Sequence, residues 1–328
     1  MKVGIIGAGI NGLMIANALA KEKNIDITIF EKKKALSGTS SSSTKLLHGG
    51  IRYLENGDFK TVFQSLQDRS WWYENAPEFC WPIRINIPFT TKKFFSFCKY
   101  SLGIFMYNIL PKRKILHANN LLDKNLDELK PSFSLNASFY DLQMDESKLG
   151  NWVKNNCLKR GVKIFEDEKV VSLTCAGTIT TDKRKYKFDK IINATGPWAS
   201  KLLIDSRIDS KFNLKLVAGS HILIEKKINN SYLLPNYDDN RVVFVIDYLG
   251  KTLIGTTEIE VKPEEINELS ISAEEIEYLL KVYNKYMINK LTYDDISSSF
   301  TGVRPLIKSK KKKLKNISRE YQIEVIKN

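Results

Sequence analysis

The first residues whose types and spacing could do chemistry are three glycines and one carboxylate. Gly7, Gly9 and Gly12 directly follow a short apolar run. In such a pattern the first glycine makes a tight turn, the second lets the backbone approach a pyrophosphate, and the third lets a helix pack closely on a sheet. Glu31 ends a second apolar run 19 residues after Gly12, where a carboxylate can accept hydrogen bonds from ribose hydroxyls. The pattern predicts a dinucleotide site; the alternative is a purely structural glycine turn.

The glycines do not distinguish NAD from FAD, but the segment that follows them does. Residues 39–55 read TSSSSTKLLHGGIRYLE, and together with the glycine turn they resemble the FAD-dependent glycerol-3-phosphate dehydrogenases, which are D-amino-acid-oxidase-like FAD oxidoreductases. Further motifs that fit this family follow in order along nearly the whole chain: INATGPWA (192–199), GSHILI (219–224), RVVFVID (241–247), IGTTE (254–258), YLLKVYNKY (278–286), TGVRPL (301–306) and SREYQIE (318–324).

The resemblance implies an α/β fold with α+β character in its second domain. A Rossmann-like domain would bind FAD on a parallel sheet assembled from separated segments, and an antiparallel sheet would cover the flavin and shape the substrate site. We expect the cofactor domain in residues 1–80, 145–210 and 300–328. The substrate domain would then occupy residues 81–144 and 211–299.

The resemblance also implies a reaction. The family oxidises sn-glycerol 3-phosphate to dihydroxyacetone phosphate and passes electrons from the flavin to a membrane quinone or, in its oxidases, to oxygen. The expected partners are therefore a small phosphorylated substrate and a quinone or oxygen, and a homodimer is compatible with the sequence. The residues alone also allow another small anionic hydroxy acid or an amine as substrate, because paired arginines require an anion and not a phosphate.

The resemblance assigns the cofactor contacts to four short segments. These contacts are Gly7, Gly9, Asn11, Gly12, Glu31, Lys32, Thr39, Ser40, Lys45, Leu47, His48, Gly49, Thr195 and Gly196. The serine-rich loop at 37–50 could instead be a flexible linker. It is short and leads directly into an apolar, helix-like stretch, which favours a contact with the cofactor.

Oxidation of a secondary alcohol needs a hydride acceptor and a group that takes the hydroxyl proton. His221 is the candidate base, because it lies in the GSHILI strand that would face the flavin. The alternative for His221 is a histidine buried for structural reasons. His48 is the rival, although its loop position favours a flavin contact, and His117 lies among basic residues typical of a surface.

The substrate anion needs cationic partners, and arginine binds phosphate better than lysine because its guanidinium forms two parallel hydrogen bonds. Arg52 and Arg304 match the family's substrate-side arginines, and Arg304 is also a candidate to polarise the reacting oxygen. Tyr53 would add a hydrogen bond. The alternative for both arginines is a structural ion pair.

The elements that must position these residues can be read from periodicity. Residues 2–6 and 25–30 predict parallel strands joined by an alanine-rich helix that runs to about Lys23. A helix is expected over 147–160 with Ser147 as its N-cap, followed by strands over 162–192 with a turn at Gly177. Residues 220–257 alternate in the manner of an antiparallel sheet, and residues 273–290 have helical periodicity.

Composition describes a globular chain with an excess of positive charge. Of the 328 residues, 43% are hydrophobic, and the net charge of +14 favours polyanions such as anionic membrane surfaces and phosphorylated substrates. Nucleic acid is not expected, because no recognition motif accompanies the charge. The four cysteines lack C-x-x-C spacing and only three histidines occur, so we expect no metal site, buried structural thiols and a reducing, cytoplasmic compartment.

Two basic segments are candidates for contact with the inner face of a membrane. Residues 94–110 are rich in aromatic side chains and precede the basic triplet 112–114, and residues 308–315 read KSKKKKLK. An aromatic and basic surface can lie in the interface of a bilayer. The alternatives are a core helix for the first segment and a solvated loop for the second.

The sequence departs from the family near residue 328. The family continues with a strand, a Gly-Gly-Lys loop that opens a helix against the flavin, and a helical cap domain. We expect their absence to leave a strand vacancy in the cofactor domain and to remove backbone donors and a lysine from the site. A fragment, an inactive remnant and a short form completed by a partner are three readings that the sequence leaves open.

Overall fold

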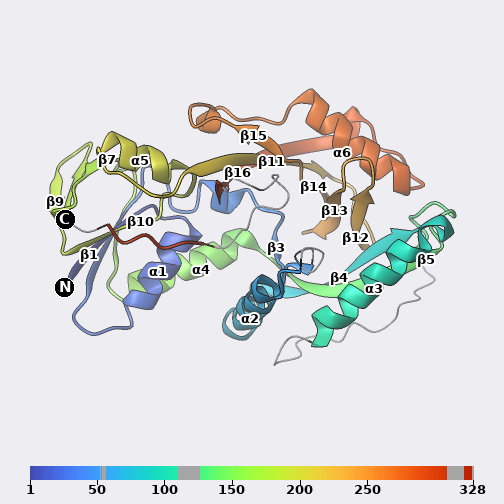
Figure 1. The fold of residues 1–328 in the computed structure, drawn as a ribbon, viewed down its shortest axis with the longest axis horizontal. Helices are drawn as coiled ribbons and strands as arrows, with labels where there is room; N and C mark the ends of the chain where they lie inside the picture. Colours follow the sequence, from blue (N-terminus) through green and yellow to red (C-terminus); the bar gives the residue numbers. More distant parts are fainter. Residues whose placement is uncertain (52, 54–56, 110–125, 309–320, 327–328) are drawn as a thin grey trace.

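A computed structural model describes residues 1–51, 53, 57–109, 126–308 and 321–326 (Figure 1). Its two main sheets are a four-stranded parallel sheet and a nine-stranded mixed sheet. In Figure 1 the parallel sheet lies at the left, where both chain ends also lie, and the mixed sheet extends to the right. The predicted combination of a parallel sheet with a second, mainly antiparallel sheet is confirmed.

The parallel sheet has the order β10-β1-β2-β6 and is built from segments far apart in the chain. Its strands are β1 (Lys2–Ile6), β2 (Asp26–Phe30), β6 (Lys163–Phe165) and β10 (Lys190–Asn193). β1 and β2 are buried after their first residue, because both faces of the sheet are covered. Helices α1 (Ile10–Leu19) and α4 (Glu146–Lys159) pack on one face. A small antiparallel sheet packs on the other, formed by β7 (Val170–Leu173), β8 (Thr178–Thr181) and β9 (Lys185–Lys187).

The mixed sheet has the order β15-β11-β14-β13-β12-β4-β5-β3, with β16 also paired to β11. Its strands are β3 (Leu46–Leu47), β4 (Cys80–Phe89), β5 (Leu135–Met144), β11 (Leu214–Ile224), β12 (Ser231–Asn236), β13 (Arg241–Tyr248), β14 (Lys251–Gly255), β15 (Ile259–Val261) and β16 (Ile296–Ile307). The antiparallel prediction fails at one pair, because β12 runs parallel to β4 where two separate chain segments meet.

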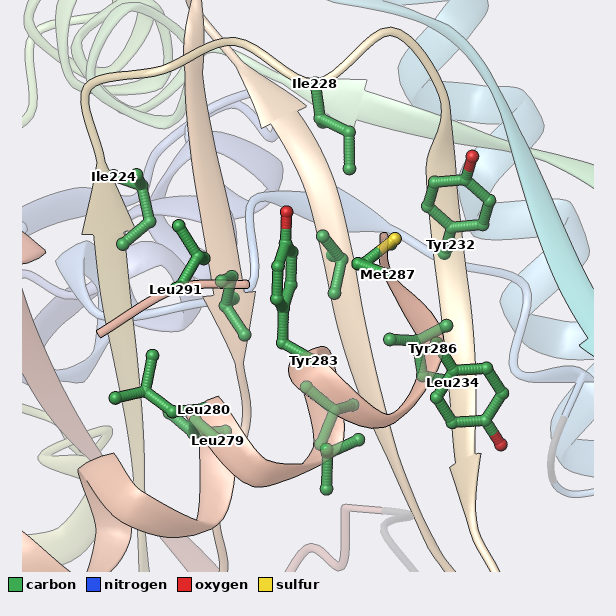
Figure 2. Close-up of a cluster of buried hydrophobic side chains, with 14 of the residues drawn as sticks. Ile224, Ile228, Tyr232, Leu234, Leu279, Leu280, Tyr283, Tyr286, Met287 and Leu291 are labelled. Atoms are coloured by element: carbon green, nitrogen blue, oxygen red, sulfur yellow. The ribbon is translucent and has the colours of Figure 1, made fainter. Parts of the chain in front are cut away.

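Helices cover both faces of the mixed sheet. On one face, α6 (Ala273–Tyr286) packs its apolar side against β11–β14, and Figure 2 shows Leu279, Leu280 and Tyr283 pointing at the strands. On the other face, α2 (Phe59–Asn75) and α3 (Phe94–Ile109) close a second core. His221 on β11 and Arg304 on β16 therefore belong to a rigid sheet that is packed on both faces.

β11 and β16 form the longest pairing in the protein, from Leu214↔Ile307 to Ile224↔Ile296. The predicted boundary at residue 300 falls inside β16, so residues 300–307 lie in the mixed sheet and not in the parallel sheet. The remaining division into two domains stays a prediction.

Three local predictions need correction. α1 ends at Leu19 and not near Lys23, and α4 is capped by Asp145, whose carboxylate accepts from the backbone N–H of Lys148, and not by Ser147. Cys80 and Cys157 are buried as expected, but Cys98 and Cys175 are exposed. The predictions for Arg52, His117, the triplet 112–114 and most of the lysine run at 308–315 fall outside the described residues.

Candidate functional site

A cavity of 1610 Å³ opens where the ends of β1 and β2 face β16. Sites for drug-sized ligands are about 300–1,000 Å³, so the space suits a larger ligand. Ten of the predicted cofactor residues line it: Gly7, Gly9, Asn11, Glu31, Lys32, Thr39, Ser40, Leu47, Thr195 and Gly196. Gly12, Lys45, His48 and Gly49 do not line it, and neither do His221, Arg304 or Tyr53.

The glycine turn has the backbone that its sequence predicts. Gly7 has a φ of +102°, which L side chains rarely adopt, and it lies against the backbone of Ala194 at the end of β10. A side chain at Gly12 would overlap the carbonyl oxygen of Gly7. The absence of that side chain lets α1 start directly above β1. Its N-cap, Gly9, offers no side-chain acceptor to the first turn, so the turn is open to an anion apart from the N–H of Ile10.

Glu31 and Ser40 fix the two sides of this turn. One carboxylate oxygen of Glu31 accepts from the backbone N–H of Ala8 at 2.9 Å, and the other accepts from the backbone N–H of Lys33 at 3.1 Å. Ser40 Oγ accepts from the N–H of Ile10 at 2.9 Å. Each oxygen keeps a further lone pair, so the Glu31 carboxylate can still accept from ribose hydroxyls.

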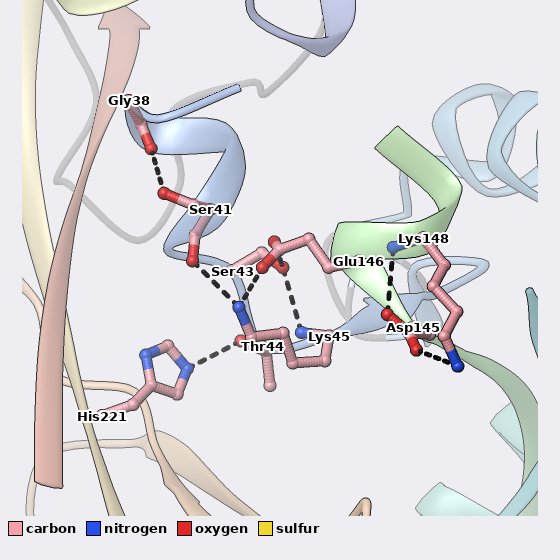
Figure 3. Close-up of polar contacts among 9 residues, drawn as sticks. All are labelled: Gly38, Ser41, Ser43, Thr44, Lys45, Asp145, Glu146, Lys148 and His221. Atoms are coloured by element: carbon pink, nitrogen blue, oxygen red, sulfur yellow. Dashed lines mark hydrogen bonds and ion pairs between the residues drawn. The ribbon is translucent and has the colours of Figure 1, made fainter. Parts of the chain in front are cut away.

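The serine-rich loop is an ordered bridge and not a linker (Figure 3). Lys45 is buried at its end, where the ammonium pairs with Glu146 and donates to the carbonyl of Ser41 at 2.9 Å. Ser43 Oγ donates to the other Glu146 oxygen at 2.7 Å. The predicted cofactor residue Lys45 therefore already has an anionic partner, and its role in the structure is to tie the loop to α4.

The same loop crosses β16 and reaches His221. The hydroxyl of Thr39 donates to the carbonyl of Val303 at 3.0 Å, and the loop passes so close to Gly302 that a side chain there would strike Ser42. Thr44 Oγ1 lies 3.0 Å from His221 Nε2, the contact drawn in Figure 3. The close approach over Gly302 is therefore what brings the hydroxyl to the imidazole.

His221 is enclosed almost completely, with 1% of its surface exposed. Its ring stacks on Phe300 at 4.8 Å and lies against Gly255. Burial, followed by the positive charges of Arg304 and Lys45, lowers the pKa of His221 to about 3. The imidazole is therefore neutral at physiological pH. Its Nδ1 has no hydrogen-bond partner among the described residues.

Arg304 stands on the same face of the sheet as His221. Val217 opposes Arg304 and His221 opposes Phe300 across the β11–β16 pairing, which places alternate residues of both strands on one face. The guanidinium donates to Thr256 Oγ1 at 3.1 Å and lies across Gly219, where a side chain would come within 2.8 Å of it. The cationic Arg304 and the neutral His221 thus lie on one face of the sheet, where Gly219 and Gly255 leave room for their side chains.

The turn at 48–50 belongs to a different environment. Gly49 is buried, and its N–H donates at 2.9 Å to Asp141, which also pairs with Arg69 and accepts from Tyr107. His48 is exposed, and the ring of Tyr53 packs over Gly50. The structure therefore places Gly49 against a buried ion pair and not against the cavity.

Sequence reasoning missed several residues that shape the site. Thr44 and Phe300 hold His221, Glu146 holds Lys45, and Trp198 lines the cavity. Thr44 lies in the motif at 39–55 and Trp198 in the motif at 192–199, so these family motifs are the signals that could have found them. Nothing in the sequence marks Glu146 or Asp141, because their partners are 34 to 103 residues away in the chain.

Comparison with known proteins fits this geometry. A family model described as "FAD dependent oxidoreductase" matches residues 2–320. The chain belongs to this family. The aerobic glycerol-3-phosphate dehydrogenase of Escherichia coli (strain K12) is 31% identical over 98% of the chain, as is the D-erythritol 1-phosphate dehydrogenase of Brucella abortus (strain 2308). The chain spans 66% of the length of each of these relatives.

A solved structure extends the likeness to the fold. The FAD complex of the glycerol-3-phosphate dehydrogenase from Bacillus halodurans is 25% identical, with a TM-score of 0.74 over 94% of this chain and 57% of that one. FAD is the cofactor of the family, and the cavity fits it: the open helix turn suits a pyrophosphate and Glu31 suits a ribose. Among the described residues, no cluster of histidine, cysteine or carboxylate side chains is placed to hold a metal ion.

Proposed function

We propose that the chain oxidises sn-glycerol 3-phosphate to dihydroxyacetone phosphate with FAD and passes the electrons to a quinone. The observation that supports this proposal is the pair formed by the neutral, buried His221 and the cationic Arg304 on one face of β11 and β16. Alcohol oxidation needs a proton acceptor and a hydride acceptor. FAD supplies the hydride acceptor when it is bound.

His221 is proposed to take the hydroxyl proton. A base must be unprotonated before the reaction, and the low pKa of His221 keeps the ring neutral. Phe300 on one side and Thr44 at Nε2 hold the ring in a fixed orientation. Arg304 is proposed to attract the substrate anion and to stabilise negative charge on the reacting oxygen. Arg52 and Tyr53 remain proposed substrate contacts, and the four cofactor segments remain proposed FAD contacts.

A second candidate substrate is a longer polyol phosphate. The relative from Brucella abortus is named for D-erythritol 1-phosphate and is as similar to this chain as the Escherichia coli relative, at 31% identity. Both names describe a phosphate ester next to a chain of hydroxyl groups. The His221 and Arg304 pair suits either substrate, because both present a secondary alcohol and an anion.

The test is an absorption spectrum of the purified full chain before and after anaerobic addition of substrate. Bleaching of the bound flavin by glycerol 3-phosphate would support the proposal, and faster bleaching by erythritol 1-phosphate would favour the second candidate. A flavin that dithionite reduces but neither phosphate ester reduces would overturn both. Glycerol without phosphate is the control, since it lacks the anion that Arg304 is proposed to bind.

Delivery of electrons to a quinone would place the protein at a membrane surface, and α3 offers a suitable face. Its exposed side chains include Phe94, Phe95, Leu102 and Phe105, with Lys92 beside them. Apolar side chains flanked by lysine suit an anionic lipid interface. None of the described helices is long and apolar enough to cross a bilayer. Phe95→Asp should reduce co-sedimentation with phosphatidylglycerol vesicles, whereas the same replacement at Phe59, exposed on α2, should not.

A further inference from the structure

Trp198 closes one wall of the cavity at the end where Glu31 lies. It stands on the short helical turn after β10, directly behind Gly196 and the buried Pro197. Its six-membered ring packs against Gly38 of the serine-rich loop. The ring is therefore held between the turn at 194–197 and the serine-rich loop at 37–50. Glu31, Gly38 and Trp198 all line the cavity.

Lys32 lies across this indole. Its ammonium is 3.3 Å from the centre of the Trp198 ring, a distance well inside the range of cation–π attraction. Lys32 follows Glu31 directly, and both side chains line the cavity. A lysine side chain samples many rotamers along its flexible four-carbon stem, so the indole serves to fix one of them. The result is a single positive charge held beside the carboxylate that is suited to the ribose.

We propose that Lys32 and Trp198 form the adenosine-diphosphate wall of the FAD site, in which the indole positions the ammonium to face the adenosine-side phosphate of the cofactor's pyrophosphate. The open first turn of α1 supplies backbone donors to that anion, and Lys32 supplies a full positive charge. Trp198 is then a positioning residue, because it acts on the cofactor through Lys32. This inference depends on FAD binding and is independent of the substrate.

The charges around Lys32 support a binding step that depends on pH. Desolvation lowers the pKa of Lys32 to about 8, against the opposing effect of Glu31 and with smaller contributions from Lys33 and Lys169. Lys201 also lines the cavity but is paired with Asp205. Lys32 is protonated below about pH 8 and neutral above it. FAD should therefore bind more weakly as the pH rises through this value.

The test is titration of the full-length apoprotein with FAD, ADP and FMN at about pH 7 and about pH 9. Lys32→Met should raise the Kd for FAD and for ADP by about tenfold at the lower pH and leave the Kd for FMN unchanged, because the lost contact is with the adenosine half. Lys32→Arg should bind as tightly as the wild type and lose the pH dependence, since a guanidinium does not titrate in this range.

Trp198 gives a second series. Trp198→Phe should bind FAD nearly as the wild type does, because a phenyl face still attracts an ammonium, and Trp198→Leu should weaken binding about threefold. Lys34→Met is the matched control, since Lys34 is exposed and pairs with Asp167 outside the cavity. An unchanged Kd for FAD and ADP in both Lys32→Met and Trp198→Leu would overturn the proposal. An equal loss of FMN affinity would overturn it as well, by placing the wall at the flavin.

Discussion

Two buried polar groups lie on the mixed sheet and are treated in opposite ways. At Asp141, on β5, one carboxylate oxygen accepts from Arg69, Tyr107 and the backbone of Gly49, so the charge is paired. At His221, on β11, burial removes the charge itself, and one ring nitrogen has no partner among the described residues. A satisfied charge stabilises a fold, whereas a neutral imidazole with spare capacity for a proton is suited to a reaction.

The largest effect should come from breaking the Asp141 cluster. Asp141→Ala would leave the guanidinium of Arg69 buried without its anion, which destabilises folded proteins by about 3–5 kcal/mol. Urea unfolding followed by circular dichroism measures this change. Lys34→Ala, which breaks an exposed pair with Asp167, should change stability by no more than about 1 kcal/mol. Equal effects of the two variants would show that the Asp141 cluster has no special structural role.

The second effect tests the other side of the comparison. His221→Gln should slow reduction of the flavin by glycerol 3-phosphate about a hundredfold or more, because the amide cannot take the hydroxyl proton. Thermal stability should change little, since the imidazole is uncharged and forms a single hydrogen bond to Thr44. Anaerobic stopped-flow absorbance at several substrate concentrations measures the reduction rate separately from substrate binding. A variant that loses substrate binding and keeps its reduction rate would exclude His221 as the base.

A smaller effect should follow from disturbing Arg304 without replacing it. Gly219→Ala would put a methyl group 2.6 Å from Thr256 Oγ1 and 2.8 Å from the guanidinium, so Arg304 must shift. We expect KM for the substrate to rise about tenfold with a smaller change in kcat. Gly103→Ala is the control, because Gly103 lies in α3 with open space where the side chain would go. If Gly219→Ala keeps the wild-type KM, the proposed contact of Arg304 with the substrate is wrong.

The smallest effect is the dependence of stability on pH. The folded pKa of His221 is about 3 and the unfolded value is about 6.5, so between these values the unfolded chain binds the extra proton. This group therefore stabilises the fold less as the pH falls below about 6.5. The melting temperature should drop by several degrees between about pH 7 and about pH 5, and by less in His221→Gln. Identical slopes for the two proteins would show that the fold does not lower the pKa of His221.

The sequence predicted the two sheets and the glycine turn because those features depend on local patterns. Buried runs at residues 2–6 and 26–30 and the φ of Gly7 are set by residues a few positions apart. The partners of His221 and Lys45 were not predictable in that way, because Thr44 meets His221 across 177 residues and Lys45 meets Glu146 across 101. The family motifs named the candidate residues, and only the fold showed which of them face the cavity.

The order of the strands also has a consequence for protein synthesis. β1 is made long before its neighbour β10, and the backbone N–H of Lys2 donates to Asp189 at a separation of 187 residues. At roughly 5–20 residues per second, the ribosome delivers that partner on the order of 10–40 s later. The carbonyl of Val303, which accepts from Thr39, is made later still, because it lies 264 residues away. The edge of β1 that pairs with β10 is therefore exposed while the intervening residues are made, and the cavity is complete only after β16 has emerged.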